Sequence, residues 1–273
     1  MNARDAASIA AGRLATAGVP DAKFEAELLA RESAAISRAA YFAGAELTLD
    51  DAARFDSFVE RRIEREPAPY ITGHREFYGR EFGVGPGVLV PRPETELLVE
   101  LALAELDANP NQTILEVGTG SGAVAVTVAA ERTSTRVVGT EISATAMRFA
   151  VRNAHRHAPG TGLVLADLAA AVAQADVVLA NLPYIPTWEI EALEPEVSKW
   201  EPRVALDGGE DGFALIRRLI EDCATRLLPR LLALEVAFGQ AEGVRAILAE
   251  YGRESWFVKD LSGIDRIVCS RWR

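Results

Sequence analysis

The sequence is poor in residues that bind metals or form covalent cross-links. Its 273 residues include two cysteines and three histidines. Cys223 and Cys269 lie far apart in separate apolar stretches, so they form neither a metal-binding spacing nor a disulfide framework. We expect both to be buried thiols in a reducing compartment. His155 and His157 are two positions apart on a predicted helix and point to different faces, so no metal site is predicted.

The chain also lacks a long apolar run and an excess of positive charge. No stretch approaches the ~20 apolar residues of a membrane span, and the N-terminal residues lack the basic start and apolar block of a secretion signal. There are 40 acidic and 29 basic residues, and the formal net charge is -11. Broad electrostatic binding of nucleic acid is therefore not expected. We expect a soluble cytoplasmic protein that binds neither membranes nor, stably, nucleic acid.

What is present divides the chain into three predicted regions. Residues 1–66 have almost no glycine or proline and carry apolar residues at three- and four-residue spacings, which predicts a helical bundle. Residues 67–90 are punctuated by proline and glycine, which predicts a linker that carries a β-hairpin. Residues 91–273 alternate apolar strands with helices, a pattern typical of an α/β fold with a parallel sheet. The last two strands, near 256–259 and 266–270, are joined too closely for a helical crossover and should pair antiparallel.

The tetrapeptide Asn181-Leu182-Pro183-Tyr184 directly follows a short apolar strand. In open α/β sheets, ligands bind at this carboxyl end of the strands. Asn181 offers one neutral carbonyl acceptor, and the backbone carbonyl of Leu182 offers a second. Pro183 stiffens the turn, and Tyr184 supplies a flat ring. The set suits a planar group that bears an NH2, although a plain strand-end turn with Asn as a helix cap and Tyr in the core also fits this motif alone.

Three other strand ends carry residues suited to a nucleoside. The first is followed by a glycine-rich turn made of Gly118, Thr119, Gly120, Ser121 and Gly122. Glu141 ends the second strand, where a carboxylate commonly binds ribose hydroxyls. At the third, Asp167 can accept from an adenine amino group while Leu168 packs on the ring.

The glycine spacing narrows the choice of nucleoside. It is Gly-x-Gly-x-Gly rather than the Gly-x-Gly-x-x-Gly of dinucleotide binders, and the chain has no Gly-Lys-Ser or Gly-Lys-Thr for phosphates. Together with a cradle for an NH2 group, this pattern points to S-adenosylmethionine. The expected reaction is methyl transfer to nitrogen, which needs no metal and no protein nucleophile. We predict Asn181 and Tyr184 as the catalytic residues: the amide oxygen would orient the nitrogen and stabilise its developing charge, and the ring would hold its plane.

These motifs, taken together, resemble the HemK/PrmC family of methyltransferases, and the likeness covers nearly the whole chain. It rests on residues 66–73, 76–77, 90–96, 117–122, 181–185, 200–203, 205–206, 211–212, 234–235, 240, 259–261 and 265–266. The string PRPETE at 91–96 together with the later Asn-x-Pro-Tyr is highly specific. The resemblance implies a Rossmann-like, seven-stranded class I methyltransferase sheet with an N-terminal all-helical domain and a β-hairpin linker.

The resemblance also implies a function. Members methylate the glutamine side-chain amide in the Gly-Gly-Gln motif of class 1 peptide chain release factors. Residues 118–122, Glu141, Leu168 and Asn181 would bind the cofactor, residues 181–184 would hold the glutamine, and the helical N-terminal module would dock the release factor. The family usually has Pro where this chain has Leu182, but the implied contact there is a backbone carbonyl, which Leu retains.

Two alternatives and one question stay open at this point. Asn-Leu-Pro-Tyr is also the form found in ribosomal RNA adenine dimethyltransferases, whose substrate amine fits the same cradle. A non-catalytic S-adenosylmethionine-binding protein is the other alternative. Arg92 and Glu94 in the PRPETE string could shape the methionine end of the cofactor site or tie the hairpin to the sheet.

Overall fold

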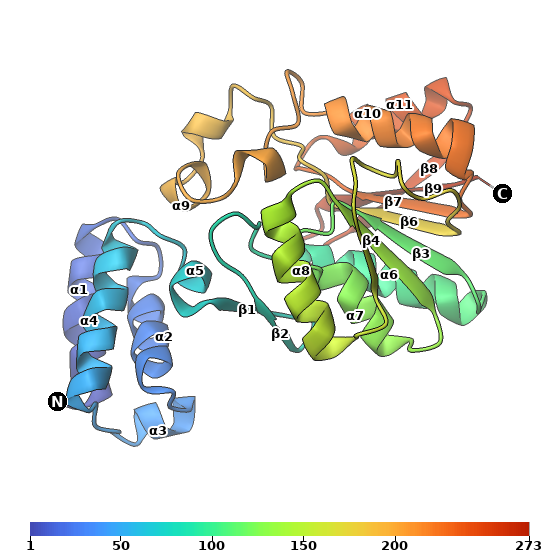
Figure 1. Ribbon diagram of the computed structural model, residues 1–273. Coiled ribbons are helices and arrows are strands. Elements are labelled where there is room, and N and C mark those ends of the chain that lie inside the picture. The colour runs from blue at the N-terminus through green and yellow to red at the C-terminus, as the bar shows by residue number, and fades with distance from the viewer. Residues whose placement is uncertain (273) are drawn as a thin grey trace. The chain divides into compact units, whose positions relative to one another are not determined.

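The computed structural model describes residues 1–272, which form two compact units (Figure 1). The helical unit contains Met1–His74 together with Glu194–Trp200. The sheet unit contains Arg75–Leu193 and the chain from Glu201 onward. The division at residues 66 and 90 that the sequence suggests, into docking, linker and catalytic domains, stays a prediction. No helix in the described part of the chain is long and apolar enough to cross a bilayer.

The helical unit confirms the predicted N-terminal helices. They are α1 (Ala3–Thr16), α2 (Ala22–Ala34), α3 (Arg38–Phe42), α4 (Leu49–Ile63) and α5 (Ala68–Thr72), joined by the later helix α9 (Pro195–Ser198). Asn2 and Thr48 accept hydrogen bonds from first-turn amides of α1 and α4, which a helix otherwise leaves without partners. Leu14, Leu29 and Phe55 are buried in a shared core, so packing between helices holds the unit together.

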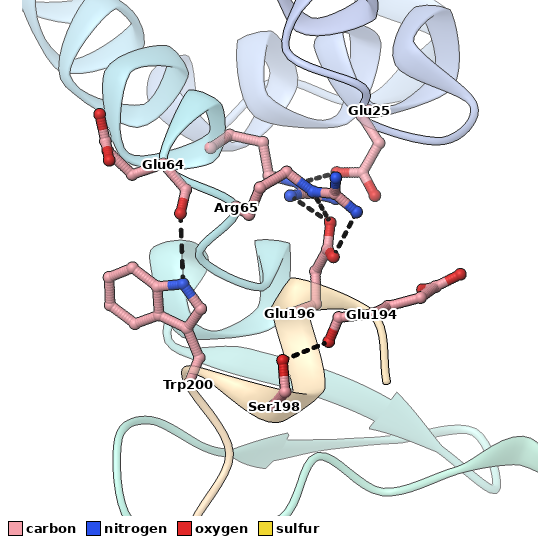
Figure 2. A network of polar contacts seen from close by, with 8 residues as sticks. Glu25, Glu64, Arg65, Glu194, Glu196, Ser198 and Trp200 are labelled. Carbon is pink, nitrogen blue, oxygen red and sulfur yellow. Dashed lines mark hydrogen bonds and ion pairs between the residues drawn. The ribbon is translucent and has the colours of Figure 1, made fainter. Parts of the chain in front are cut away.

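Helix α9 is fixed within the helical unit by charge pairs (Figure 2). Arg65 donates two hydrogen bonds of 2.6 Å to the two carboxylate oxygens of Glu196, and Arg62 contacts the same carboxylate at 2.9 Å. These bonds hold the pKa of Glu196 below its ordinary value although burial opposes ionisation. The indole of Trp200 donates to the backbone carbonyl of Glu64 at 3.3 Å. Residues 194–200, which are far from the first helices in the sequence, are thus part of the helical unit.

A short hairpin follows the first helices. It consists of β1 (His74–Phe77) and β2 (Arg80–Gly83). The two residues between the strands, Tyr78 and Gly79, have φ of 51° and 69°, as a type I′ turn requires. The Tyr78 amide donates to Glu96 at 2.8 Å, so the hairpin is tied to the last residue of the PRPETE string, where a helix begins. Glu96, rather than Arg92 or Glu94, therefore makes this connection.

The sheet unit is built on the predicted seven-stranded sheet. Its strands are β3 (Thr113–Val117), β4 (Arg136–Glu141), β5 (Gly162–Leu165), β6 (Val177–Ala180), β7 (Leu231–Glu235), β8 (Ser255–Lys259) and β9 (Asp265–Arg271). Their order across the sheet is β5-β4-β3-β6-β7-β9-β8. The first five are parallel, and β9 runs antiparallel to both β7 and β8, which confirms the predicted pairing of the last two strands.

Helices cover both faces of this sheet (Figure 1). Helices α6 (Glu96–Ala108), α7 (Ala123–Glu131) and α8 (Ala144–His157) pack on one face, and α10 (Ala214–Asp222) and α11 (Ala241–Glu250) pack on the other. Successive residues of β3 alternate between the two cores: Ile114 faces the first and Leu115 the second. Helix α6 starts after one 3-10 turn, Pro93–Thr95, and α10 is followed directly by a wider helical turn at Cys223–Leu227.

Candidate functional site

A cavity lies where the order of the strands reverses. The chain passes from β3 to β4 and β5 on one side and then returns to β6 on the other. β3 and β6 are paired up to Val117 and Ala180, but the connections that follow them lead to helices on opposite faces of the sheet, which leaves a crevice for a ligand. The cavity here measures about 610 Å³, and residues that follow β3, β4, β5 and β6 line it. A pocket of this size holds a small molecule of several hundred daltons.

The glycine loop, residues 118–122, forms one wall through residues 118–121, and Gly122 is not among the residues that line the cavity. Gly118, Gly120 and Gly122 have φ of 74°, 56° and 82°, in a region that glycine enters without strain. A Cβ on Gly122 would stand 3.3 Å from the backbone of Ala150, whereas one on Gly120 would meet nothing nearer than 4.0 Å. Gly122 is therefore required for packing between helices, and Gly120 leaves its backbone open to the cavity.

Glu141, at the end of β4, joins the glycine loop to the next helix. One carboxylate oxygen accepts from the amide of Gly120 and the other from the amide of Ser143, both at 2.8 Å. A carboxylate has about four lone-pair sites, so each oxygen can still accept from a ligand hydroxyl. Glu141 lines the cavity. Its predicted contact with ribose stays a prediction, and its contact with Gly120 is an additional feature that the sequence did not reveal.

Glu116 lies beneath the glycine loop. It is buried and lines the cavity, and it accepts hydrogen bonds from the Thr119 hydroxyl and from the Ala125 amide, the latter at 2.8 Å. Burial raises the pKa of Glu116 to about 8, even though both hydrogen bonds favour the charged form. At neutral pH its carboxyl group is therefore held mainly as the neutral acid.

The end of β5 supplies Asp167 and Leu168. Both line the cavity. Asp167 forms an ion pair with Arg218 at 2.7 Å, and both side chains are about half exposed. Leu168 is buried and has a φ of 46°. The predicted contacts of this pair with an adenine ring stay predictions, and Arg218 is a cavity residue that the sequence analysis missed.

The amide loop, residues 181–184, forms the opposite wall. Asn181 and Pro183 line the cavity, and so does Leu182, although the core packs around its side chain. Asn181 Nδ2 donates to Thr95 Oγ1 at 3.1 Å. The glycine loop and Asn181 are thus brought to one cavity, as their positions at neighbouring strand ends predict. Leu182 serves the core through its side chain and leaves only its backbone for a ligand.

Tyr184 lies differently from the other three residues of the amide loop. It is not among the residues that line the cavity, and its ring packs against the buried cluster beneath α10 and α11. Its backbone carbonyl accepts from Gln240 Nε2 at 2.8 Å. Burial keeps the pKa of Tyr184 above its ordinary value, so its hydroxyl is neutral. Stacking of this ring on a substrate amide stays a prediction.

The PRPETE string supplies residues to the cavity, and Arg92, whose role the sequence leaves open, is one of them. Pro91, Arg92 and Thr95 all line the cavity. Arg92 donates to the buried carboxylate of Glu201 at 2.5 Å, and the other oxygen of that carboxylate accepts from the Val90 amide at 3.2 Å. The string thus attaches the cavity wall to the segment that follows residue 200.

Metal-ligating residues do not gather at this site. Within residues 1–272, no three His, Cys, Asp or Glu side chains are arranged to hold a metal ion. Cys223 and Cys269 are free and buried. The polar groups at the cavity are instead carboxylates, amides and backbone N–H groups, which suit an organic ligand with hydroxyl and amino groups.

Comparisons with known proteins agree with this geometry. Residues 5–73 match the PrmC N-terminal domain, and residues 94–192 match the methyltransferase small domain. The chain is 37% identical to the release factor glutamine methyltransferase of Koribacter versatilis and 39% identical to that of Cereibacter sphaeroides, in each case over 99% of both chains. A 16S rRNA methyltransferase of T. thermophilus, solved in complex with AdoMet and guanosine, shares the fold with a TM-score of 0.54 at 20% identity, over 73% of this chain and 50% of that one.

The sheet order, the glycine loop and these likenesses define an S-adenosylmethionine-dependent methyltransferase of class I. The residues present fit that cofactor, because the open backbone of Gly120, the carboxylate of Glu141 and the apolar side chain of Leu168 all face one cavity. Within this class, the chain belongs to the family of release factor glutamine methyltransferases. The predicted family, enzyme class and cofactor are confirmed.

Proposed function

We propose that this enzyme methylates the side-chain amide nitrogen of the glutamine in the Gly-Gly-Gln motif of class 1 peptide chain release factors. The observation that carries the proposal is the state of Asn181. Its amide nitrogen is bound by Thr95, and among residues 1–272 no hydrogen bond is made to its oxygen. A neutral acceptor therefore borders the same cavity as the glycine loop. This is the group that a glutamine NH2 requires.

The amide loop would hold the glutamine through oxygen atoms. Asn181 Oδ1 and the backbone carbonyl of Leu182 would each accept one N–H of the substrate amide. Two fixed acceptors orient the nitrogen and stabilise the positive charge that develops on it during methylation. Pro183 limits the freedom of the loop, and Tyr184 supports it from the core side through its carbonyl bond to Gln240.

The glycine loop would hold the cofactor on the opposite wall. When bound, S-adenosylmethionine supplies an electrophilic methyl group. The backbone of residues 118–122 would accommodate the methionine part closely, because three glycines there replace side chains. Glu141 would accept from the ribose, Asp167 from the adenine amino group, and Leu168 would pack on the base.

Partner and place of action follow from this assignment. The helical unit would dock the release factor, as its match to the PrmC N-terminal domain supports. The enzyme would act in the cytoplasm on a factor of translation termination, with no membrane step. We do not expect stable nucleic-acid binding, in line with a net charge of -11.

The test is methyl transfer from labelled S-adenosylmethionine to purified protein and RNA substrates. We expect label on a class 1 release factor and none on the same factor with the motif glutamine replaced by alanine. Ribosomal RNA is the third substrate. Label on RNA alone would replace the proposal with an adenine methyltransferase, and binding of the cofactor with no transfer to any substrate would indicate a non-catalytic protein.

A further inference from the structure

Asn181 can accept from a substrate amide only while its oxygen faces the cavity. A carboxamide is a planar group with a donor on one branch and an acceptor on the other, so a rotation by half a turn exchanges them. The hydrogen bond from Nδ2 to Thr95 Oγ1, 3.1 Å long, places the nitrogen against the wall and directs the oxygen away from Thr95. Which atom faces the cavity therefore depends on whether Thr95 acts as an acceptor.

Thr95 acts as an acceptor because its own hydrogen is used elsewhere. Burial raises the pKa of the Glu235 carboxylate, at the end of β7, the strand next to β6, and a side-chain interaction with Thr95 opposes that rise. Above its pKa the Glu235 carboxylate is ionised and can only accept a hydrogen bond, so the Thr95 hydrogen would point to Glu235 and the lone pairs of Thr95 would be left for Asn181. Thr95 is 6% exposed and Glu235 is 2% exposed, so water does not compete for these bonds.

One carboxylate oxygen of Glu235 lacks a hydrogen-bond partner. Its Oε2 is buried without a hydrogen-bond partner in the described part of the chain. The charged and titratable groups that face it are Arg266, Arg92, Glu94 and Tyr184, from β9, the PRPETE string and the amide loop. A buried carboxylate with an oxygen that lacks a hydrogen-bond partner lowers the stability of the fold. Its presence here therefore favours a role in function rather than in stability.

We propose that Thr95 and Glu235 are positioning residues that fix the side-chain amide of Asn181 with its oxygen toward the substrate nitrogen. The proposal rests on the proposed function, since it assumes an NH2 group as the substrate. A reversed Asn181 would present N–H donors to the N–H donors of the glutamine, and the cradle would repel its substrate. Neither residue needs to touch the reacting atoms for this effect.

The first test replaces the Thr95 hydroxyl without changing the shape of the side chain. We expect Thr95→Val to lower kcat for release-factor methylation about tenfold to thirtyfold, while the Kd for S-adenosylhomocysteine changes less than threefold. Thr95→Ser, which restores the hydroxyl, should recover kcat to within threefold of wild type. The matched control is Thr127→Val, because Thr127 is also buried in the sheet unit and its hydroxyl has no partner among the described residues. That control should behave as wild type.

Several results would overturn the proposal. Thr95→Val with wild-type kcat would do so, as would a serine variant no better than the valine variant, or a loss explained by weaker cofactor binding. If the wild-type enzyme transfers no methyl group to the release factor, the proposed function itself is refuted, and this outcome is distinct from the others.

The second test uses pH and does not depend on the folding of Thr95 variants. Burial raises the pKa of Glu235 to about 7. Below that pH the protonated carboxyl can donate to Thr95, whose hydrogen then becomes free to bind Asn181 Oδ1. We expect wild-type kcat to fall several-fold as the pH is lowered from 8 to 6, and the kcat of Glu235→Gln to be low and unchanged over this range. Identical pH profiles for the two proteins would refute the role of Glu235.

Discussion

The glycine loop and the amide loop border the same cavity but are held in place by different means. The glycine loop takes its shape mainly from its own backbone, with three glycines at positive φ. The amide loop depends on residues far away in the sequence: Thr95 binds the side chain of Asn181, and Gln240 binds the carbonyl of Tyr184. The loop that would bind the cofactor and the loop that would orient the substrate amide therefore have separate supports. Mutations should therefore affect one without the other.

The largest expected effect on catalysis without an equal effect on cofactor binding is that of Asn181→Ala. We expect kcat to fall by ~10²–10³, the loss typical when one donor or acceptor at a developing charge is removed. The Kd for S-adenosylhomocysteine should stay within about tenfold of wild type, because the glycine loop is intact. Single-turnover methylation and calorimetric titration measure the two quantities. Unchanged turnover would mean that the amide of residue 181 does not hold the substrate.

Glu141→Ala should give the opposite pattern. The carboxylate supports the Gly120 amide and borders the cavity, so its removal should weaken cofactor binding by ~10- to 100-fold, in line with ~1.5–3 kcal/mol for a hydrogen bond to a charged group. At saturating cofactor, kcat should stay within about threefold. Glu141→Gln, which keeps one acceptor oxygen, serves as the intermediate control. A loss confined to kcat would place Glu141 on the substrate side of the cavity.

Gln240→Leu tests the support of the amide loop more gently. The substitution removes the 2.8 Å hydrogen bond to the Tyr184 carbonyl, a contribution of ~1 kcal/mol, so we expect kcat to fall about fivefold. Cofactor affinity should not change. The same single-turnover assay measures the effect, and an equal fall in cofactor affinity would show that the two loops are not independent.

The smallest effect concerns stability rather than activity. Because burial raises the pKa of Glu116 to about 8, the folded protein binds a proton there that the unfolded chain releases above its ordinary pKa. The free energy of unfolding should therefore decline as pH rises from about 5 to about 8. Glu116→Gln should lessen that decline by ~1–3 kcal/mol, since glutamine keeps an acceptor for Thr119 and Ala125 and does not ionise. Denaturant unfolding at pH 5, 7 and 8.5 measures it, and parallel declines in both proteins would contradict the assignment.

The difference between the loops also explains which parts of the site could be predicted from sequence. Glycine spacing and residues that follow apolar strands are local patterns, so the sequence predicts residues 118–122, Glu141 and Asn181 as site residues, and all of them except Gly122 line one cavity. The close spacing of the last two strands likewise gave their antiparallel pairing. Thr95 and Asn181 are 86 positions apart, and no local pattern links such a pair. Tyr184 was ambiguous for a physical reason, since a ring after a strand suits a cavity wall and a core equally.

The place of α9 in the helical unit bears on how this protein can be dissected. Glu196 and Trp200 find their partners in Arg62, Arg65 and Glu64, all encoded more than a hundred positions earlier. A fragment that starts at Arg75 would keep the glutamate and the indole but lose everything they bind. The two units are therefore interleaved along the gene, and a truncated enzyme or a swapped N-terminal module must carry residues 194–200 with it to remain whole.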